Sequence, residues 1–272
     1  MDIYEEVKQF YENADGEKRI IGKSLFGRNL YAVKVGHGAP VGIAQYALHG
    51  REWITAKVAF AHFARGVKGS CWLIPLANPD GALLSQRGII SAGSERAKKR
   101  LLTLNGGEDF RHWKANGRGV DLNVNFPAQW GKGAKNTRIA GAENYIGTKP
   151  CSEPETRALV RFTEKISPDY TVSYHTKGEE IYWYFYQSIR TCSRDKRLAL
   201  AISRSTGYPL CHAKGSAGGY KDWCVETRKI PSFTIEAGAD WLRHPIDERG
   251  LWSLLWKNKN VLYDLSEEYT KL

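Results

Sequence analysis

Several features of exported and membrane proteins are missing from this sequence of 272 residues. No apolar run approaches the ~20 residues that a membrane-spanning helix needs. The first residues, Met1 to Glu6, are acidic and then amphipathic, and they lack the basic stretch, apolar segment and small-residue cleavage site of a signal peptide. We therefore expect a cytoplasmic protein without a membrane partner, although non-classical export or a spore compartment fits the same pattern.

The sequence also lacks a cysteine pattern that would indicate disulfides or a cysteine metal site. Its five cysteines are scattered without a Cys-x-x-Cys pair, and an odd number cannot complete a disulfide framework. We expect reduced thiols. No internal repeat, low-complexity tract or linker is present, and large single-domain α/β enzymes reach this length, so we expect one domain covering residues 1–272.

Charge of one sign is in excess, because the formal net charge at pH 7 is +11. A field of that sign attracts anionic partners such as nucleic acid, acidic lipid or acidic cell-wall polymer. The basic residues are dispersed, however, and no repeat interleaves them with aromatic residues. The charge does not choose among these partners, and it fits a simple role in solubility equally well.

The hydrophobic pattern of the first part of the chain predicts a helix, two strands and a crossover. Apolar residues recur at helical spacing in Ile3–Glu12, and alternating stretches at Arg19–Ser24 and Asn29–Val35 flank a turn like a hairpin. The apolar runs Val41–Leu48 and Cys71–Pro75 then lie on either side of a helical segment from Trp53 to Ala64. This strand, helix, strand order predicts a sheet with parallel strands.

The middle of the chain, Gly81–Ile146, is rich in glycine, asparagine and basic residues, so we expect mostly loop there. A connection of that length is usually functional in a compact domain. Ser152 with Glu155 then forms a capping box that predicts a helix to about Lys165.

The rest of the chain predicts two more strands and two helical regions. The strands are expected at Tyr170–Tyr174 and Ile230–Ile235, and the helical patterns at Asp195–Thr206 and Ser253–Tyr269. Strands and helices therefore alternate through most of the sequence, which favours the α/β class.

Two potential metal ligands, His49 and Glu52, lie where the strand Val41–Leu48 ends and a helix begins. Open α/β sheets bind their ligands at this carboxyl edge. A catalytic zinc site with two histidines and one glutamate needs one more histidine, and His175 is the best candidate because it ends the strand Tyr170–Tyr174. Taken alone, His-x-x-Glu also fits a surface ion pair at a helix start.

The neighbouring motifs resemble those of the zinc carboxypeptidases, the carboxypeptidase A-like family, from about Ile21 to the end of the chain. In order they are His49-Gly50-Arg51-Glu52-Trp53-Ile54-Thr55, Asn78-Pro79-Asp80-Gly81, Gly119-Val120-Asp121-Leu122-Asn123, Ser173-Tyr174-His175 and Phe233-Thr234-Ile235-Glu236. The resemblance implies an α/β/α sandwich around a mixed, roughly eight-stranded sheet. It also implies one zinc ion (Zn2+) bound by His49, Glu52 and His175.

The resemblance carries further roles onto single residues. Asp121 matches an aspartate that hydrogen-bonds a zinc-binding histidine and so fixes its tautomer, although an ordinary turn aspartate is the alternative. Glu236 matches the glutamate that takes a proton from water and returns it to the leaving amine. Arg118 falls near the arginine that stabilises the oxyanion, and Arg111 and Lys114 are its rivals.

The chain departs from the family where most members bind the terminal carboxylate of the substrate. Val124 replaces the arginine of an Asn-Arg pair that clamps this group, although Asn123 and Arg51 remain. Lys214 stands at the place of a mobile tyrosine, and Lys221 falls at the floor of the pocket for the residue after the scissile bond. The alternative for both lysines is solvated loop charge.

These departures resemble the γ-D-glutamyl-diamino acid peptidases, which cut the stem peptides of the bacterial cell wall. Their substrates place carboxylates around the scissile amide, and lysines could bind them, so the resemblance implies a muropeptide as substrate. Two alternatives stay open, an ordinary C-terminal metallocarboxypeptidase and a non-catalytic protein of the same fold that binds peptidoglycan or nucleic acid. We expect an enzyme and no nucleic-acid partner. The residue at the third position, diaminopimelate or lysine, and the oligomeric state stay open.

Overall fold

The computed structural model describes residues 1–272 and contains one eight-stranded mixed sheet, with the strand order β1-β2-β4-β3-β5-β8-β6-β7. The strands are β1 (Lys18–Lys23), β2 (Asn29–Gly36), β3 (Val41–Tyr46), β4 (Ser70–Ile74), β5 (Tyr170–His175), β6 (Glu180–Tyr182), β7 (Leu210–Cys211) and β8 (Ser232–Glu236). The central strands β4, β3, β5 and β8 run parallel to their neighbours in that series. They are buried almost throughout, which explains why the sequence shows apolar runs there and no alternation.

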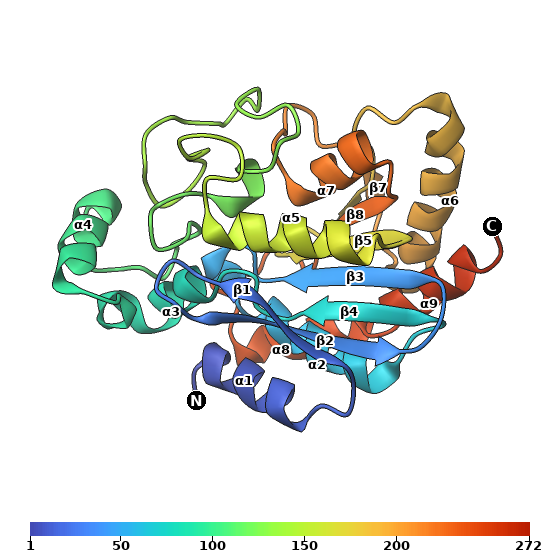
Figure 1. Ribbon diagram of the computed structural model, residues 1–272, viewed down its shortest axis with the longest axis horizontal. Coiled ribbons are helices and arrows are strands. Elements are labelled where there is room, and N and C mark those ends of the chain that lie inside the picture. Colours follow the sequence, from blue (N-terminus) through green and yellow to red (C-terminus); the bar gives the residue numbers. More distant parts are fainter.

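The helices cover both faces of this sheet (Figure 1). They are α1 (Ile3–Asn13), α2 (Thr55–Arg65), α3 (Pro79–Arg87), α4 (Glu95–Asn105), α5 (Pro154–Ile166), α6 (Ile189–Thr206), α7 (Tyr220–Trp223), α8 (Glu248–Asn258) and α9 (Val261–Tyr269). Short turns of other helix types are η1 (Gly50–Glu52), η2 (Gly88–Ser91), η3 (Leu122–Val124) and η4 (Cys224–Arg228). No helix combines the length and the apolar character needed to cross a membrane.

Two hydrophobic cores lie on opposite faces of the sheet. The larger one packs α1, α2, α6, α8 and α9 against one face, and the smaller one packs α5 and α7 against the other. Figure 1 shows these two layers with the strands between them. The predicted α/β/α sandwich around an eight-stranded mixed sheet is therefore confirmed. All five cysteines are free, as expected.

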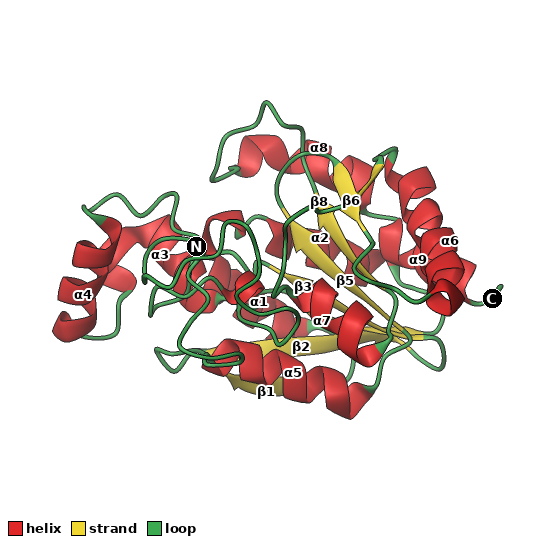
Figure 2. Cartoon of the chain, turned by 90° about the horizontal axis from the view of Figure 1, so that it is seen from above, coloured by secondary structure: helices red, strands yellow, loops and turns green.

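The expectation that residues 81–146 are mostly loop was wrong for its first third, because α3 and α4 occupy much of it. Asn78 caps α3 by accepting a hydrogen bond from Gly81 N at 2.9 Å, and Ser94 caps α4 in the same way. Only Leu101 of α4 is fully buried, and charged residues make up five of its eleven positions, so few apolar residues indicated this helix in the sequence. Figure 2 shows α4 projecting from one end of the molecule.

Two other boundaries differ from the predictions. The N-cap of α5 is Glu153 and not Ser152, because Pro154 takes the first helical position and the Ser152 hydroxyl donates to Glu153 instead. The single helical pattern predicted over Ser253–Tyr269 is two helices, α8 and α9. The other strands and helices begin or end within a few residues of the predicted bounds, except that α6 begins earlier and β6, β7 and α7 were not predicted.

Three buried carboxylates, the acid cluster, lie where the turn after β1 meets the starts of α3 and α5. They belong to Asp80, Glu153 and Glu155. Asp80 pairs with Arg28 at 2.6 Å, while Glu153 and Glu155 both accept from the side-chain amide of Asn116, at 2.9 and 3.2 Å. Burial, together with the charge of Asp80, raises the pKa of Glu155 from 4.5 to about 7.

Candidate metal centre and catalytic site

The candidate metal ligands lie at one edge of the sheet, where the parallel strands β3, β5 and β8 end. His49 follows β3, His175 is the last residue of β5, and Glu236 is the last residue of β8. His175 and Glu236 are direct partners in the register of β5 with β8. Because neighbouring parallel strands end at the same edge, side chains that are far apart in the sequence are brought together here.

The turn that carries His49 and Glu52 is fixed by close backbone packing. A Cβ atom on Gly50 would come within 2.5 Å of the backbone of Gly81, so only glycine lets η1 approach α3 this closely. Gly50 N also donates to the carbonyl of Lys114 at 2.9 Å. The Asn78 side chain reinforces the junction, since its amide donates to the carbonyl oxygens of Leu48 and Ala115 at 3.1 and 3.2 Å.

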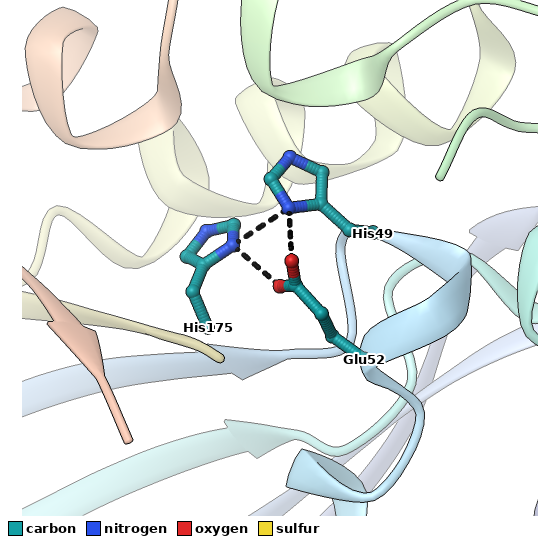
Figure 3. Close-up of side chains that lie close together, drawn as sticks. All are labelled: His49, Glu52 and His175. Atoms are coloured by element: carbon teal, nitrogen blue, oxygen red, sulfur yellow. Dashed lines mark hydrogen bonds and ion pairs between the residues drawn. The ribbon is translucent and has the colours of Figure 1, made fainter. Parts of the chain in front are cut away.

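His49, Glu52 and His175 point their polar atoms at one another (Figure 3). The Nδ1 atom of His175 lies 3.0 Å from Nδ1 of His49 and 2.9 Å from Oε2 of Glu52, and His49 Nδ1 lies 2.9 Å from Oε1 of Glu52. All three side chains are buried. These contacts define the metal triad, His49, Glu52 and His175.

The donor set of the metal triad fits one zinc ion. Its ligand atoms all lie within 4.8 Å of one another. Two imidazoles and one carboxylate are a common set in catalytic zinc sites, which leave the fourth position to water or substrate. Two imidazole nitrogens that face each other and a buried carboxylate form a site for a cation. The triad can therefore hold one zinc ion.

Asp121 supports the triad from behind. Its Oδ1 lies 3.3 Å from Nε2 of His49, the nitrogen that faces away from the other ligands, and its Oδ2 lies 3.0 Å from the Lys114 ammonium. Burial opposes the charge on Asp121, but Lys114 and His49 outweigh it and hold the pKa of the carboxyl well below its usual range. A permanently charged carboxylate in this place keeps the His49 proton on Nε2 and frees Nδ1 to bind a metal.

Glu236 stands beside the triad in a different electrostatic setting. Burial raises its pKa from 4.5 to about 7, His175 opposes this shift, and the negative charge of Glu52 adds to it. A carboxyl group with a pKa near neutrality can both accept and return a proton at physiological pH. This arrangement can perform the work of a general base and acid next to a metal ion.

The three cations considered for the oxyanion lie in different places. Lys114 contacts Asp121, and although burial opposes its charge, Asp121 and Glu52 raise its pKa. Arg118 is partly exposed and its Nε atom lies 3.8 Å from Oε2 of Glu153, in the acid cluster. Arg111 is exposed and pairs with its neighbour Asp109 at 2.7 Å. Of the three, the structure brings Lys114 into contact with the surroundings of the metal triad.

A cavity of about 220 Å³, the inner cavity, opens beside Glu236. Asn123 and Lys221 also line it, whereas Lys214 lines a separate cavity of about 280 Å³, the outer cavity. The predicted substrate-binding lysines are therefore divided between two neighbouring cavities that share Ala213 and Ser216. Arg51, on the metal-binding turn, has its Nη1 atom 3.6 Å from Oε2 of Glu143.

Sequence reasoning missed several residues that line the inner cavity, among them Tyr182, Asp222 and Thr234. Thr234 precedes Glu236 by two positions in β8 and so lies on the same face of the strand, which the strand period could have indicated. Asp222 is the neighbour of Lys221, and the adjacent opposite charges were the available signal. Tyr182 lies on β6, a strand too short to be recognised from its sequence.

Comparisons with known proteins agree with this geometry. The model of the zinc carboxypeptidase family matches residues 67–241. The γ-D-glutamyl-L-diamino acid endopeptidase 1 of Lysinibacillus sphaericus is 29% identical over 249 residues, which are 84% of this chain and 62% of that protein. The murein peptide amidase A of Escherichia coli K12 is 32% identical over 125 residues, which are 42% of this chain and 47% of that protein. The chain thus spans less than two thirds of the length of either relative.

Solved structures show the same fold. Bovine thrombin-activatable fibrinolysis inhibitor gives a TM-score of 0.80 at 18% identity, over 100% of this chain and 97% of that chain. The murein-tripeptide amidase of Escherichia coli O157 gives 0.59 at 23% identity, over 93% of this chain and 94% of that chain. With the family model covering more than half of the sequence, and a His-Glu-His triad able to bind one zinc ion, this chain belongs to the zinc carboxypeptidase family.

Proposed function

We propose that this chain is a zinc-dependent peptidase that hydrolyses the amide bond between γ-D-glutamate and a diamino acid in peptidoglycan stem peptides. The observation that carries the proposal is the position of Glu236, which pairs with His175 of the metal triad in the sheet register and also lines the inner cavity. The names of the two curated relatives support this substrate class, since one is an endopeptidase for γ-D-glutamyl-diamino acids and the other a murein peptide amidase.

The residues divide the chemistry among them. A zinc ion held by His49, Glu52 and His175 would lower the pKa of water to about 7 and polarise the scissile carbonyl. Glu236 takes the proton from the attacking water and returns it to the leaving amine, for which a pKa near 7 is suitable. We assign stabilisation of the oxyanion to Lys114 in place of Arg118, because Lys114 lies next to Asp121 and the triad.

The substrate preference follows from the missing clamp. Val124 carries no charge, so a peptide with an ordinary free C-terminus lacks its usual bidentate partner. Cationic groups remain around the site on Arg51, Lys214 and Lys221, and Asn123 lines the inner cavity. The free α-carboxylate of a γ-linked D-glutamate and the carboxylates of diaminopimelate are suitable partners for these cations. The cytoplasmic location stays a prediction.

A product analysis tests the proposal directly. The zinc-loaded protein is incubated with L-alanyl-γ-D-glutamyl-meso-diaminopimelate and, separately, with an unmodified L-tripeptide, and the products are identified by mass spectrometry. We expect release of free diaminopimelate from the first substrate and slow turnover of the second. Preferred release of a C-terminal residue from the L-tripeptide would instead establish an ordinary carboxypeptidase, and salt-sensitive binding without turnover would indicate a non-catalytic protein.

A further inference from the structure

Three tryptophans near the end of the chain are mostly exposed, although most tryptophans of this protein are buried. Trp241, Trp252 and Trp256 are 79%, 69% and 62% exposed, whereas five of the nine tryptophans are buried. The three lie in the loop between β8 and α8 and on α8 itself. Figure 2 shows α8 along the edge of the molecule. Large apolar side chains that gather on the surface indicate an interaction site.

The three side chains belong to one surface, the tryptophan surface. Trp252 and Trp256 are one helical turn apart on α8, and their rings stack with centroids 5.4 Å apart and an interplanar angle of 14°. Gly250, in the first turn of α8, packs against the preceding loop, because a Cβ atom there would lie 3.6 Å from the Leu242 side chain. Trp241 precedes Leu242 and is therefore held beside the start of α8.

The charges around the tryptophan surface are positive in excess. Residues 238–259 contain three acidic residues, and each of them is paired with a cation. The ion pairs of this segment are Asp240 with Lys177, Asp247 with Arg249, Glu248 with Lys57 and Lys257 with Glu179. Arg243 and Lys259 have no acidic partner. The Lys259 ammonium lies 5.0 Å from the centre of the Trp256 ring, so a free cation adjoins the stacked indoles.

The geometry separates three kinds of partner that could cover these indoles. A sugar stacks on an open ring face, but Trp252 and Trp256 cover each other on one side and Lys259 lies over Trp256. A second copy of the chain would need about 800 Å² from each partner, whereas the exposed parts of the three tryptophans supply about 500 Å². A lipid bilayer needs neither, because indoles lie among the headgroups and their N–H groups donate to lipid oxygens.

We propose that the tryptophan surface docks on a bilayer of anionic phospholipids. The indoles lie at the level of the headgroups, and Arg243 and Lys259 bind lipid phosphates there. The net charge of +11 adds a longer-range attraction to the same bilayer. The apolar runs of the sequence report only helices that span a membrane, so they did not indicate this surface.

Docking on this surface holds the catalytic edge of the sheet near the bilayer. The loop that carries the first tryptophan begins directly after Glu236. In the same loop, Nε2 of His244 lies 3.0 Å from Oγ1 of Thr176, the residue after His175. None of the three tryptophans lines the inner cavity, so the proposed hydrolysis of a soluble peptide does not depend on docking.

Cosedimentation of the full, zinc-loaded chain with vesicles tests the proposal. We expect binding to vesicles made of equal parts phosphatidylglycerol and phosphatidylcholine. Binding to phosphatidylcholine alone should be about tenfold or more weaker, because each basic residue near an anionic surface contributes several-fold in affinity. Lipids brominated in the upper part of their acyl chains should quench part of the tryptophan fluorescence of the bound protein.

Substitutions assign the binding to the surface. The double variant Trp252→Ser, Trp256→Ser should bind the mixed vesicles about tenfold or more weakly and lose most of the quenching. The double variant Arg243→Gln, Lys259→Gln should show a similar loss on mixed vesicles and none on phosphatidylcholine. Ile139→Ser is the matched control, because it removes a side chain that is also 79% exposed but lies in another loop, and it should leave binding unchanged.

The outcomes separate docking from the alternatives and from the proposed function. No binding of the unaltered protein to mixed vesicles, or an equal loss in Ile139→Ser and the tryptophan double variant, would overturn the inference. A dimer that this double variant dissociates in ultracentrifugation would also overturn it, as would binding to isolated glycan strands that the same variant loses.

Hydrolysis of soluble L-alanyl-γ-D-glutamyl-meso-diaminopimelate by the tryptophan double variant should equal that of the unaltered protein. A failure of docking therefore leaves the proposed function intact, and vesicle binding without hydrolysis would support docking while refuting that function. Zinc content and unfolding temperature show whether each variant is folded. If the tryptophan double variant does not fold, the variant of the two cations and the quenching of the unaltered protein decide the question.

Discussion

Two groups of buried carboxylates in this molecule differ in what lies opposite each of them. At the edge of the sheet, Glu52 faces two histidines and Asp121 faces His49 and Lys114. These partners hold the pKa of both carboxyls well below their usual range, although burial opposes the charge. The carboxylates of this group are therefore charged, and they are arranged around groups that can bind a metal.

In the acid cluster, the partners of Glu155 carry no positive charge. Its oxygens accept from the backbone N–H of Leu25 and the amide of Asn116, both of which are neutral, while Asp80 adds a negative charge nearby. No positive charge there offsets the cost of burying the carboxylate, so the pKa of Glu155 rises to about 7. The comparison teaches that burial of an acidic residue does not by itself indicate a functional site. Whether a buried carboxylate can bind a metal or serves only as a structural hydrogen-bond acceptor depends on the groups that surround it.

The largest effect is expected from removing one ligand of the metal triad. His175→Ala leaves two of the three protein ligands, so zinc affinity should fall until the purified variant contains almost no zinc, and hydrolysis should fall to background. Metal analysis with a parallel activity assay measures both. Glu155→Gln, a change in the acid cluster, should keep full zinc occupancy. Full zinc occupancy in His175→Ala would contradict the assignment of the triad.

Glu236→Gln should separate catalysis from metal binding. The amide keeps the shape of the side chain but cannot take a proton, so zinc should stay bound while kcat falls by about 10²- to 10⁴-fold. A variant with bound zinc and near-normal kcat would require a different general base.

The pH profile of the unaltered enzyme provides a second measurement of the same residue. Glu236 must be deprotonated to accept a proton, so activity should decrease as the pH falls through its pKa. That pKa is about 7 without metal, and a zinc ion beside it should lower it, because a positive charge favours the carboxylate. The acidic limb should therefore lie below pH 7 and should be missing from the residual activity of Glu236→Gln.

The sequence predicted the residues whose positions follow from strand ends. His49, His175 and Glu236 each occur where an apolar run stops, and parallel strands bring such ends to one edge. Lys114 was not separated from its two rivals, because its place depends on contacts across the fold, namely the bond of its carbonyl to Gly50 N and its ion pair with Asp121. No local pattern encodes such contacts.

The positions of the two predicted substrate-binding lysines likewise depend on contacts that no local sequence pattern encodes. The resemblance placed Lys214 where a mobile tyrosine stands and Lys221 at the floor of the pocket for the residue after the scissile bond, and in the structure the two lysines line two neighbouring cavities. The helix α4 was missed because it is rich in charged residues and only Leu101 is fully buried, so few apolar residues indicated it. Single-domain organisation over residues 1–272 stays a prediction.

The smallest expected effect concerns stability and comes from the acid cluster. Glu155 binds its proton with a pKa of about 7 in the folded protein, against 4.5 as its ordinary value. Between these two values the folded state holds more protons than the unfolded state, so the free energy of unfolding must fall as the pH rises through this window. At about 1.36 kcal/mol for each pH unit, the loss from Glu155 alone is about 3 kcal/mol when the window has been crossed.

Glu155→Gln isolates this contribution, because an amide stays neutral at every pH. Urea unfolding at pH 5 and at pH 8 should show that the free energy of unfolding falls by about 2 to 3 kcal/mol more in the unaltered protein than in the variant. Glu164→Gln makes the same exchange on the exposed side of α5 and so measures the effect of removing a surface charge. Equal losses for the unaltered protein and Glu155→Gln would show that Glu155 is charged throughout. The contrast between the two groups of carboxylates would then disappear, since both groups would have to be stabilised by their surroundings as anions.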